Sequence, residues 1–171
     1  MRTSRLGVLF IARREGLVLT AYQDGEHKSI GFGSNDPTLK EGDTITVKEA
    51  FQRLKADIEK REKSVEKALK VPLEQHEWDA LFSLFYQGGS DGLKAVAGLI
   101  NDGMKLQAAE EFLNWDTNAA GEHKEGLMKR RRLERDLFLN ANYGDIDPIP
   151  YWEGNPRTTA MKQYRVTDED L

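Results

Sequence analysis

The sequence predicts an α+β fold, in which a small antiparallel sheet lobe and a larger helical lobe are joined by a long helix. Strand-like alternation is confined to residues 17–33, whereas the later stretches up to residue 140 have helical spacing of their apolar side chains. Such segregation of strands and helices is typical of α+β proteins rather than of wound parallel sheets. We expect a cleft between the lobes, because ligand sites form preferentially at such junctions.

The sheet lobe is expected to follow a short first helix that ends at Gly16, a residue type favoured at helix C-termini. Apolar and polar side chains then alternate over residues 17–33, as in half-buried strands. Asp24-Gly25 interrupts the alternation and indicates the turn of a hairpin. The sheet lobe therefore covers about residues 17–45.

The long helix and the helical lobe follow from capping and breaking residues. Thr46 and Glu49 form a capping box that opens the long helix, and Pro72 ends it. The Gly88-Gly89 pair is expected to interrupt the helical region. Helices are predicted in the helical lobe, residues 73–143, at 73–86, 93–100, 106–115 and 127–140.

Residues 144–171 are predicted to be a non-helical extension of a domain that spans residues 1–143. Three of the five prolines fall in this last segment, and proline is disfavoured inside helices and central strands. We considered two uses for the extension, as a docking segment in a larger assembly or as a cover folded back over the cleft.

Composition limits the chemistry available to the protein. The chain has 171 residues, 39% hydrophobic and 32% charged, with no cysteine and three histidines that lack metal-ligand spacing. We therefore expect no metal or cofactor, and chemistry from carboxylates, hydroxyls and cations. The net charge of -4 argues against a nucleic-acid partner. Neither a signal peptide nor an apolar span is found, so we expect a protein made in the cytoplasm, without stable membrane insertion. We also expect a monomer.

Two carboxylates near the N-terminus are the candidate catalytic groups. Glu15 ends the first helix, Asp24 lies in the hairpin turn, and Ser29 lies on the returning strand. Hydrolysis of a glycosidic bond uses one protonated and one ionised carboxyl group. Burial near the helix would favour Glu15 as the acid, and a wet turn would favour Asp24 as the base. By itself this pattern also fits an ordinary helix end and an ordinary turn.

A resemblance decides between these interpretations. The runs Ile-Ala-Arg-Arg-Glu-Gly-Leu (11–17), Ala-Tyr-Gln-Asp (21–24) and Ser-Ile-Gly-Phe-Gly (29–33) resemble the signature of the phage-type lysozymes, the endolysin (muramidase) family that includes the T4 and P22 enzymes. The resemblance continues through Gly-Asp-Thr-Ile-Thr (42–46), the region 73–90, and the run from 126 to 139, and covers about residues 6–141. In that family a Glu, an Asp and a Thr form the catalytic triad. The resemblance thus implies Glu15, Asp24 and Ser29 as the catalytic residues.

The chain departs from the family pattern at three places. Ser29 stands where the family has Thr, which keeps the hydroxyl but loses the methyl group that stiffens the side chain. The hairpin between Asp24 and Ser29 is one residue shorter, and such a change alters strand register. Gln87 replaces the family's Asn at the end of a helix.

The resemblance implies hydrolysis of the β-1,4 bond between N-acetylmuramic acid and N-acetylglucosamine in bacterial peptidoglycan, leading to host cell lysis. It assigns substrate binding to Gly31, Phe32, Gln87 and an arginine of the last helix, for which Arg130 and Arg131 are the candidates. In such lytic systems a holin opens the membrane so that the enzyme reaches the cell wall. The alternative is a weakened module of the same fold that binds peptidoglycan or serves in a phage assembly.

Two tryptophans are further candidates for contact with sugar. Trp115 and Trp152 lie outside the strongly apolar stretches, and either indole ring could stack on a sugar ring. Trp78, by contrast, is expected in the core.

Overall fold

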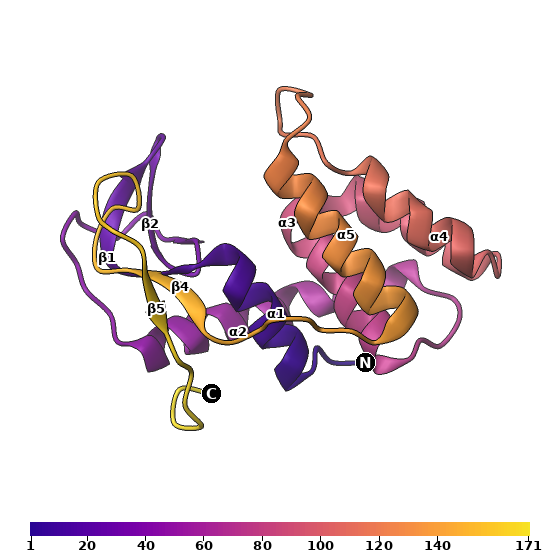
Figure 1. Cartoon of the computed structure of the whole chain (residues 1–171), viewed down its shortest axis with the longest axis horizontal. Helices are drawn as coiled ribbons and strands as arrows, with labels where there is room; N and C mark the ends of the chain where they lie inside the picture. Colours follow the sequence, from indigo (N-terminus) through magenta and orange to yellow (C-terminus); the bar gives the residue numbers. More distant parts are fainter. The chain divides into compact units, whose positions relative to one another are not determined.

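The computed structural model describes residues 1–171 and divides into two compact units (Figure 1). The helical unit comprises residues 1–7 and 58–144, and the sheet unit comprises residues 8–57 and 145–171. Helices α1 (Arg5–Glu15) and α2 (Val47–Ala68) each contribute residues to both units. The predicted α+β class is confirmed, whereas the cleft expected between the lobes stays a prediction.

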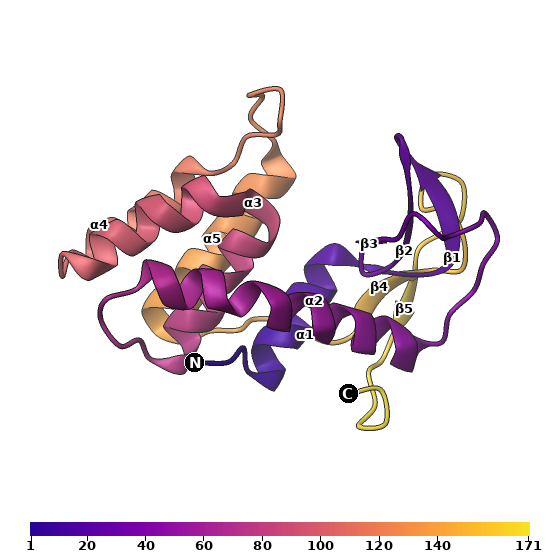
Figure 2. The ribbon, with the colours of Figure 1, turned by 180° about the vertical axis from the view of Figure 1, so that it is seen from behind.

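The sheet unit contains a five-stranded sheet with the order β3-β2-β1-β4-β5 (Figures 1 and 2). Its strands are β1 (Leu17–Asp24), β2 (His27–Gly31), β3 (Ser34–Asn35), β4 (Ile149–Trp152) and β5 (Lys162–Tyr164). Strands β1 and β2 form the predicted antiparallel hairpin, whose tight turn contains Gly25 in the left-handed region, at φ 62°. The register places Tyr22 opposite Ser29.

Residues 144–171 are not a separate extension of the domain, because two strands of the sheet come from them. Strand β4 pairs in parallel with β1, with Val18 opposite Trp152, and β5 pairs antiparallel with β4. The prediction that this segment is not helical is confirmed. The two strands were not predicted from the sequence, because they are short and β4 contains Pro150, so the alternating pattern of a strand is missing.

Part of the core of the sheet unit lies where α2 packs against the residue that follows β2. The rings of Phe32 and Phe51 lie 4.8 Å apart between centroids, and both side chains are buried. The predicted capping box opens α2, since the backbone N–H of Thr46 donates to Oε2 of Glu49 at 2.7 Å and the backbone N–H of Glu49 donates to Oγ1 of Thr46 at 3.2 Å. The helix ends at Ala68, before the proline that was expected to end it.

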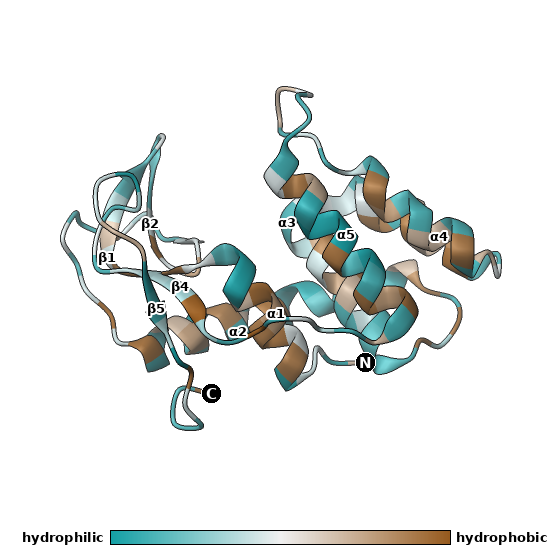
Figure 3. Ribbon diagram, viewed as in Figure 1, coloured by the Kyte–Doolittle hydropathy of each residue, from teal (hydrophilic) through white to brown (hydrophobic).

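The helical unit is built around α3 (Gln75–Asn101), which packs against α5 (Glu125–Asn140) and α4 (Lys105–Glu111). A 3-10 turn, Phe112–Asn114, follows α4. Hydrophobic and hydrophilic residues alternate along α4 and α5, as expected of helices with one buried face (Figure 3). Helical geometry breaks inside α3 at Gly89, with φ 79° and ψ -167°, which confirms the predicted interruption. No helix is both long enough and apolar enough to cross a bilayer.

A fully buried carboxylate, Asp79 on α3, ties the two ends of the helical unit's chain together. It accepts hydrogen bonds from the backbone N–H of Ser4 at 3.0 Å and from the hydroxyl of Tyr143 at 2.7 Å. Burial, and then the hydrogen bond to Asp79, raise the pKa of Tyr143 to about 12. The protonated phenol is therefore the form that the folded protein favours.

Candidate active site

A small cavity in the sheet unit brings together residues that are far apart in the sequence. It has a volume of about 220 Å³ and is bordered by Glu15, Tyr22, Ser29 and Gly31 from α1, β1 and β2, and by Trp152 from β4. Pockets for drug-sized ligands measure roughly 300–1,000 Å³, so this cavity has room for one ring of a longer chain rather than for several.

Glu15 reaches this cavity because α1 ends abruptly after it. Gly16 adopts the left-handed conformation, with φ 74°, and its backbone N–H donates to the carbonyl oxygen of Ala12 at 2.9 Å. This is the helix end that the sequence predicted, since glycine adopts this conformation without the steric cost of a side chain. Glu15 is half-buried there and borders the cavity.

Ser29 is buried on β2, and its hydroxyl lies between two polar neighbours. Oγ of Ser29 donates to Oδ1 of Asn35 at 2.8 Å and lies 3.5 Å from Oδ2 of Asp24. Because the shorter contact takes the hydroxyl proton, the lone pairs of Oγ remain available to accept a hydrogen bond. Sequence reasoning missed Asn35, which lies on the two-residue strand β3 and has no local pattern that would indicate it.

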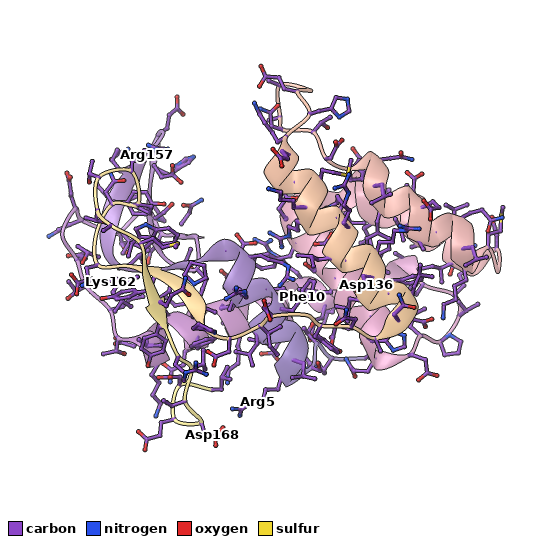
Figure 4. The ribbon with its side chains drawn as sticks, viewed as in Figure 1. Arg5, Phe10, Asp136, Arg157, Lys162 and Asp168 are labelled. Atoms are coloured by element: carbon purple, nitrogen blue, oxygen red, sulfur yellow. The ribbon has the colours of Figure 1, made fainter.

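Asp24 ends β1 and faces the C-terminal segment. Its Oδ1 pairs with Nη2 of Arg157 at 2.9 Å, and Figure 4 labels this arginine at the sheet unit. Both charges act on the neighbouring Tyr22. Burial first, and the negative charge of Asp24 second, raise the pKa of the Tyr22 hydroxyl, while the positive charge of Arg157 lowers it. Tyr22 is thus a neutral hydrogen-bonding group beside the cavity at neutral pH.

Three of the residues predicted to bind substrate lie in the helical unit. Gln87 accepts a hydrogen bond from Nη2 of Arg131 at 2.9 Å. Arg130 and Arg131 are buried and pair with the fully buried Glu134, through Nε atoms at 3.0 and 2.9 Å. The hydroxyl of Ser83 donates to the same carboxylate at 2.6 Å. The structure therefore gives these arginines a buried ion-pair network, and their role in binding substrate stays a prediction.

Gly31 and Phe32, which were also predicted to bind substrate, lie in different surroundings. Gly31 borders the cavity at φ 67°, whereas the ring of Phe32 is buried against Phe51. Of the two candidate tryptophans, Trp152 borders the cavity, while the ring nitrogen of Trp115 donates to Glu111 at 3.1 Å in the helical unit. The sequence had no means of choosing between the tryptophans, because the choice depends on the pairing of β4 with β1.

The comparisons with known proteins identify a family to which the chain is similar. Residues 12–134 match the model of the family described as phage lysozyme. The chain is 34% identical to an endolysin of Bacillus phage PZA over 175 aligned positions, which cover 99% of this chain and 66% of that protein. It is 33% identical to an endolysin of Salmonella phage P22, covering 82% of this chain and 99% of that protein. A solved endolysin from Escherichia coli O157:H7 phage FAHEc1 superposes with a TM-score of 0.78 at 36% identity, covering 85% of this chain and 98% of that one.

The chain belongs to the phage lysozyme family. The match to the family model ends at residue 134, before β4 and β5 begin. The alignment with the Bacillus phage endolysin, in contrast, takes in nearly the whole chain, which spans just under two thirds of that longer protein. The C-terminal strands of this phage lysozyme homologue therefore lie within a region that aligns with this relative and that lies outside the match to the family model.

Proposed function

We propose that this phage lysozyme homologue hydrolyses the β-1,4 bond between N-acetylmuramic acid and N-acetylglucosamine in bacterial peptidoglycan. The observation that carries the proposal is the arrangement around one cavity. Glu15 and Ser29 both border it, and Asp24 lies beside Ser29. Membership of the phage lysozyme family, whose named relatives are endolysins, supports the same substrate class.

Glu15 is the general acid in this proposal. Its half-buried side chain borders the cavity at the end of α1, and a general acid must lie within hydrogen-bond reach of the oxygen that it protonates. The protonated group donates to the oxygen of the scissile bond, which leaves as an alcohol. Positive charge meanwhile develops on the sugar ring, as in the oxocarbenium-like transition state of glycosidases.

Asp24 and Ser29 hold and activate the attacking water. The hydroxyl of Ser29 keeps its acceptor lone pairs because its proton is directed to Asn35, and Asp24 supplies a negative charge at 3.5 Å from that hydroxyl. A water in contact with both groups is oriented by the hydroxyl and made more nucleophilic as the carboxylate accepts its proton. The anomeric form of the first product, observed by NMR, distinguishes an inverting course from a retaining one.

Access to the substrate is part of the proposal. We expect the protein to be made in the host cytoplasm and to act on the cell wall once a second agent of the holin type has opened the membrane. We also expect it to act as a monomer. Light scattering at working concentration tests the second expectation.

The decisive experiment measures the reducing ends released from purified peptidoglycan. We expect Glu15→Gln to abolish release and Asp24→Asn to lower it by about 10²-fold or more, the range in which positioned acid and base groups contribute. Glu41→Gln, which removes an exposed carboxylate elsewhere in the sheet unit, is the matched control and should retain the wild-type rate. Full activity in Glu15→Gln, with an unchanged thermal unfolding profile, would contradict the assignment.

The same assay tests the alternative of a binding module. A module that holds the glycan without cutting it would sediment with peptidoglycan and release no reducing ends. That result would indicate that catalysis has been lost, and the serine at position 29 and the shorter hairpin would be the structural explanation.

A further inference from the structure

We propose that the segment 149–164 is a working part of the active site, in which Trp152 forms a wall for a sugar ring and Arg157 positions the carboxylate of Asp24. The inference rests on the proposed hydrolysis of peptidoglycan and assigns two residues to it. Both lie beyond the region that matches the family model, and neither was singled out as catalytic from the sequence.

Trp152 is placed at the cavity by the pairing of two strands. Val18 of β1 lies opposite Trp152 of β4, and the indole ring lies over Gly16, the residue after the proposed acid. A Cβ atom built on Gly16 would lie only 2.7 Å from Cζ3 of Trp152, so the ring is in direct contact with this backbone. Trp152 also borders the cavity that Glu15 and Ser29 line.

A half-buried indole in this position offers the apolar face that a sugar ring requires. The C–H groups of a pyranose make one side of it apolar, and a large flat aromatic ring buries that side without needing a hydrogen-bond partner. The cavity has room for about one such ring, as its volume of about 220 Å³ indicates. Trp152 therefore contacts the substrate directly, next to the bond that Glu15 protonates.

Arg157 acts on the other carboxylate. Its Nη2 atom lies 2.9 Å from Oδ1 of Asp24, while Oδ2 of the same carboxylate lies 3.5 Å from Oγ of Ser29. One oxygen is thus held by the guanidinium, and the other is left facing the hydroxyl that orients water. The turn that presents Arg157 is ordered by Asn155, whose Oδ1 accepts from the backbone N–H of Arg157 at 2.9 Å.

The pair between Arg157 and Asp24 is better suited to orientation than to stability. The two side chains are 67% and 43% exposed, and exposed ion pairs contribute about 0–1 kcal/mol to folding. Removing the arginine should therefore leave the fold intact while freeing the Asp24 side chain to rotate away from Ser29. This separation makes the positioning role testable.

The test compares variants of the full chain by their steady-state release of reducing ends from purified peptidoglycan. Arg157→Ala should lower kcat about two- to fivefold at unchanged KM, the effect of losing an exposed pair, and Arg157→Lys should restore part of it. Trp152→Ala should raise KM about tenfold, and Trp152→Phe less. The matched control is Arg165→Ala, which removes a 78% exposed arginine of the same C-terminal region, and it should match wild type.

Salt provides a readout that a merely structural role would not change. At about 1 M salt the Debye length is about 3 Å, so the pair is screened and the rate ratio of wild type to Arg157→Ala should approach one. The same ratio for Arg165→Ala should stay near one at every salt concentration. The inference would be overturned if the wild type is active and Arg157→Ala and Trp152→Ala both have the kinetic constants of the control.

A binding measurement keeps the inference separate from the proposed function. Calorimetric titration of Glu15→Gln with a tetramer of N-acetylglucosamine should show binding that weakens about tenfold when Trp152→Ala is added. If the alanine variant unfolds at a lower temperature, Trp152→Phe replaces it, and the loss of affinity should then be smaller. An inactive wild type that still binds in this Trp152-dependent way would contradict the hydrolysis and support the sugar wall. Equal binding with and without the indole would overturn the wall.

Discussion

Gly16 links the proposed acid to the C-terminal strands, and its replacement by alanine isolates that link. The residue has φ 74°, and an added Cβ would lie 2.7 Å from Cζ3 of Trp152. The left-handed conformation costs roughly 1–2 kcal/mol for a residue with a side chain. Forcing a methyl group against a packed ring adds about 1–3 kcal/mol. We therefore expect Gly16→Ala to lower the free energy of unfolding by about 2–5 kcal/mol.

Two glycines provide controls that separate the two costs. Gly103 has the same φ, 74°, just after helix α3, and Gly33 in the sheet unit has φ 80°. At both positions an added Cβ would meet nothing within 4 Å. Gly103→Ala and Gly33→Ala should therefore lose only the roughly 1–2 kcal/mol of the conformational cost. The additional loss in Gly16→Ala is assigned to the contact with Trp152.

Urea unfolding at 25 °C measures these differences through the midpoint, provided that the slope is the same for all variants. Combining Gly16→Ala with Trp152→Ala closes a double-mutant cycle, in which the extra loss should disappear because the opposing ring is gone. Equal losses in Gly16→Ala and in both controls would refute the reasoning, since the contact with the ring would then cost nothing. Activity gives a second readout, because a displaced Trp152 should reduce hydrolysis in Gly16→Ala and not in Gly103→Ala.

Three further substitutions test the hydrogen bonds and ion pairs of the buried side chains Asp79, Glu134 and Ser29. Tyr143→Phe should destabilise by about 1.5–3 kcal/mol at pH 7 by removing a hydrogen bond to buried Asp79. Folding raises the pKa of Tyr143 from its ordinary value of 10.0 to about 12, so this contribution is fully present below pH 10 and is lost as the pH rises through 12. A difference in urea midpoint between wild type and Tyr143→Phe that stays constant over this pH range would contradict the prediction. Glu134→Ala should cost about 3–5 kcal/mol by leaving buried Arg131 without its carboxylate, and a loss under about 1 kcal/mol in urea unfolding would count against the network. Asn35→Ala should slow release of reducing ends about two- to tenfold by freeing the hydroxyl of Ser29, which we propose to orient the attacking water. An unchanged rate would exclude that role for Asn35.

Much of the local structure could be predicted because it depends on a few neighbouring residues. The capping box of Thr46 and Glu49 needs only a spacing of three residues, and the helix end at Gly16 needs only a glycine after an amphipathic stretch. The turn at Gly25 follows the same logic. These features fixed the positions of Glu15 and Asp24 on their elements before any tertiary contact was considered.

The surroundings of those carboxylates were decided by contacts between distant segments. Arg157 lies 133 positions after Asp24 in the sequence, and Trp152 reaches the cavity only through the parallel pairing of β4 with β1. The burial of Phe32 likewise depends on its packing against α2. Pairing of this kind depends on backbone hydrogen bonds and on closing a long loop, neither of which produces a local periodicity that can be recognised in the sequence. The sequence by itself therefore determined where Glu15 and Asp24 lie on their helix and hairpin, and the tertiary structure decided which side chains surround them.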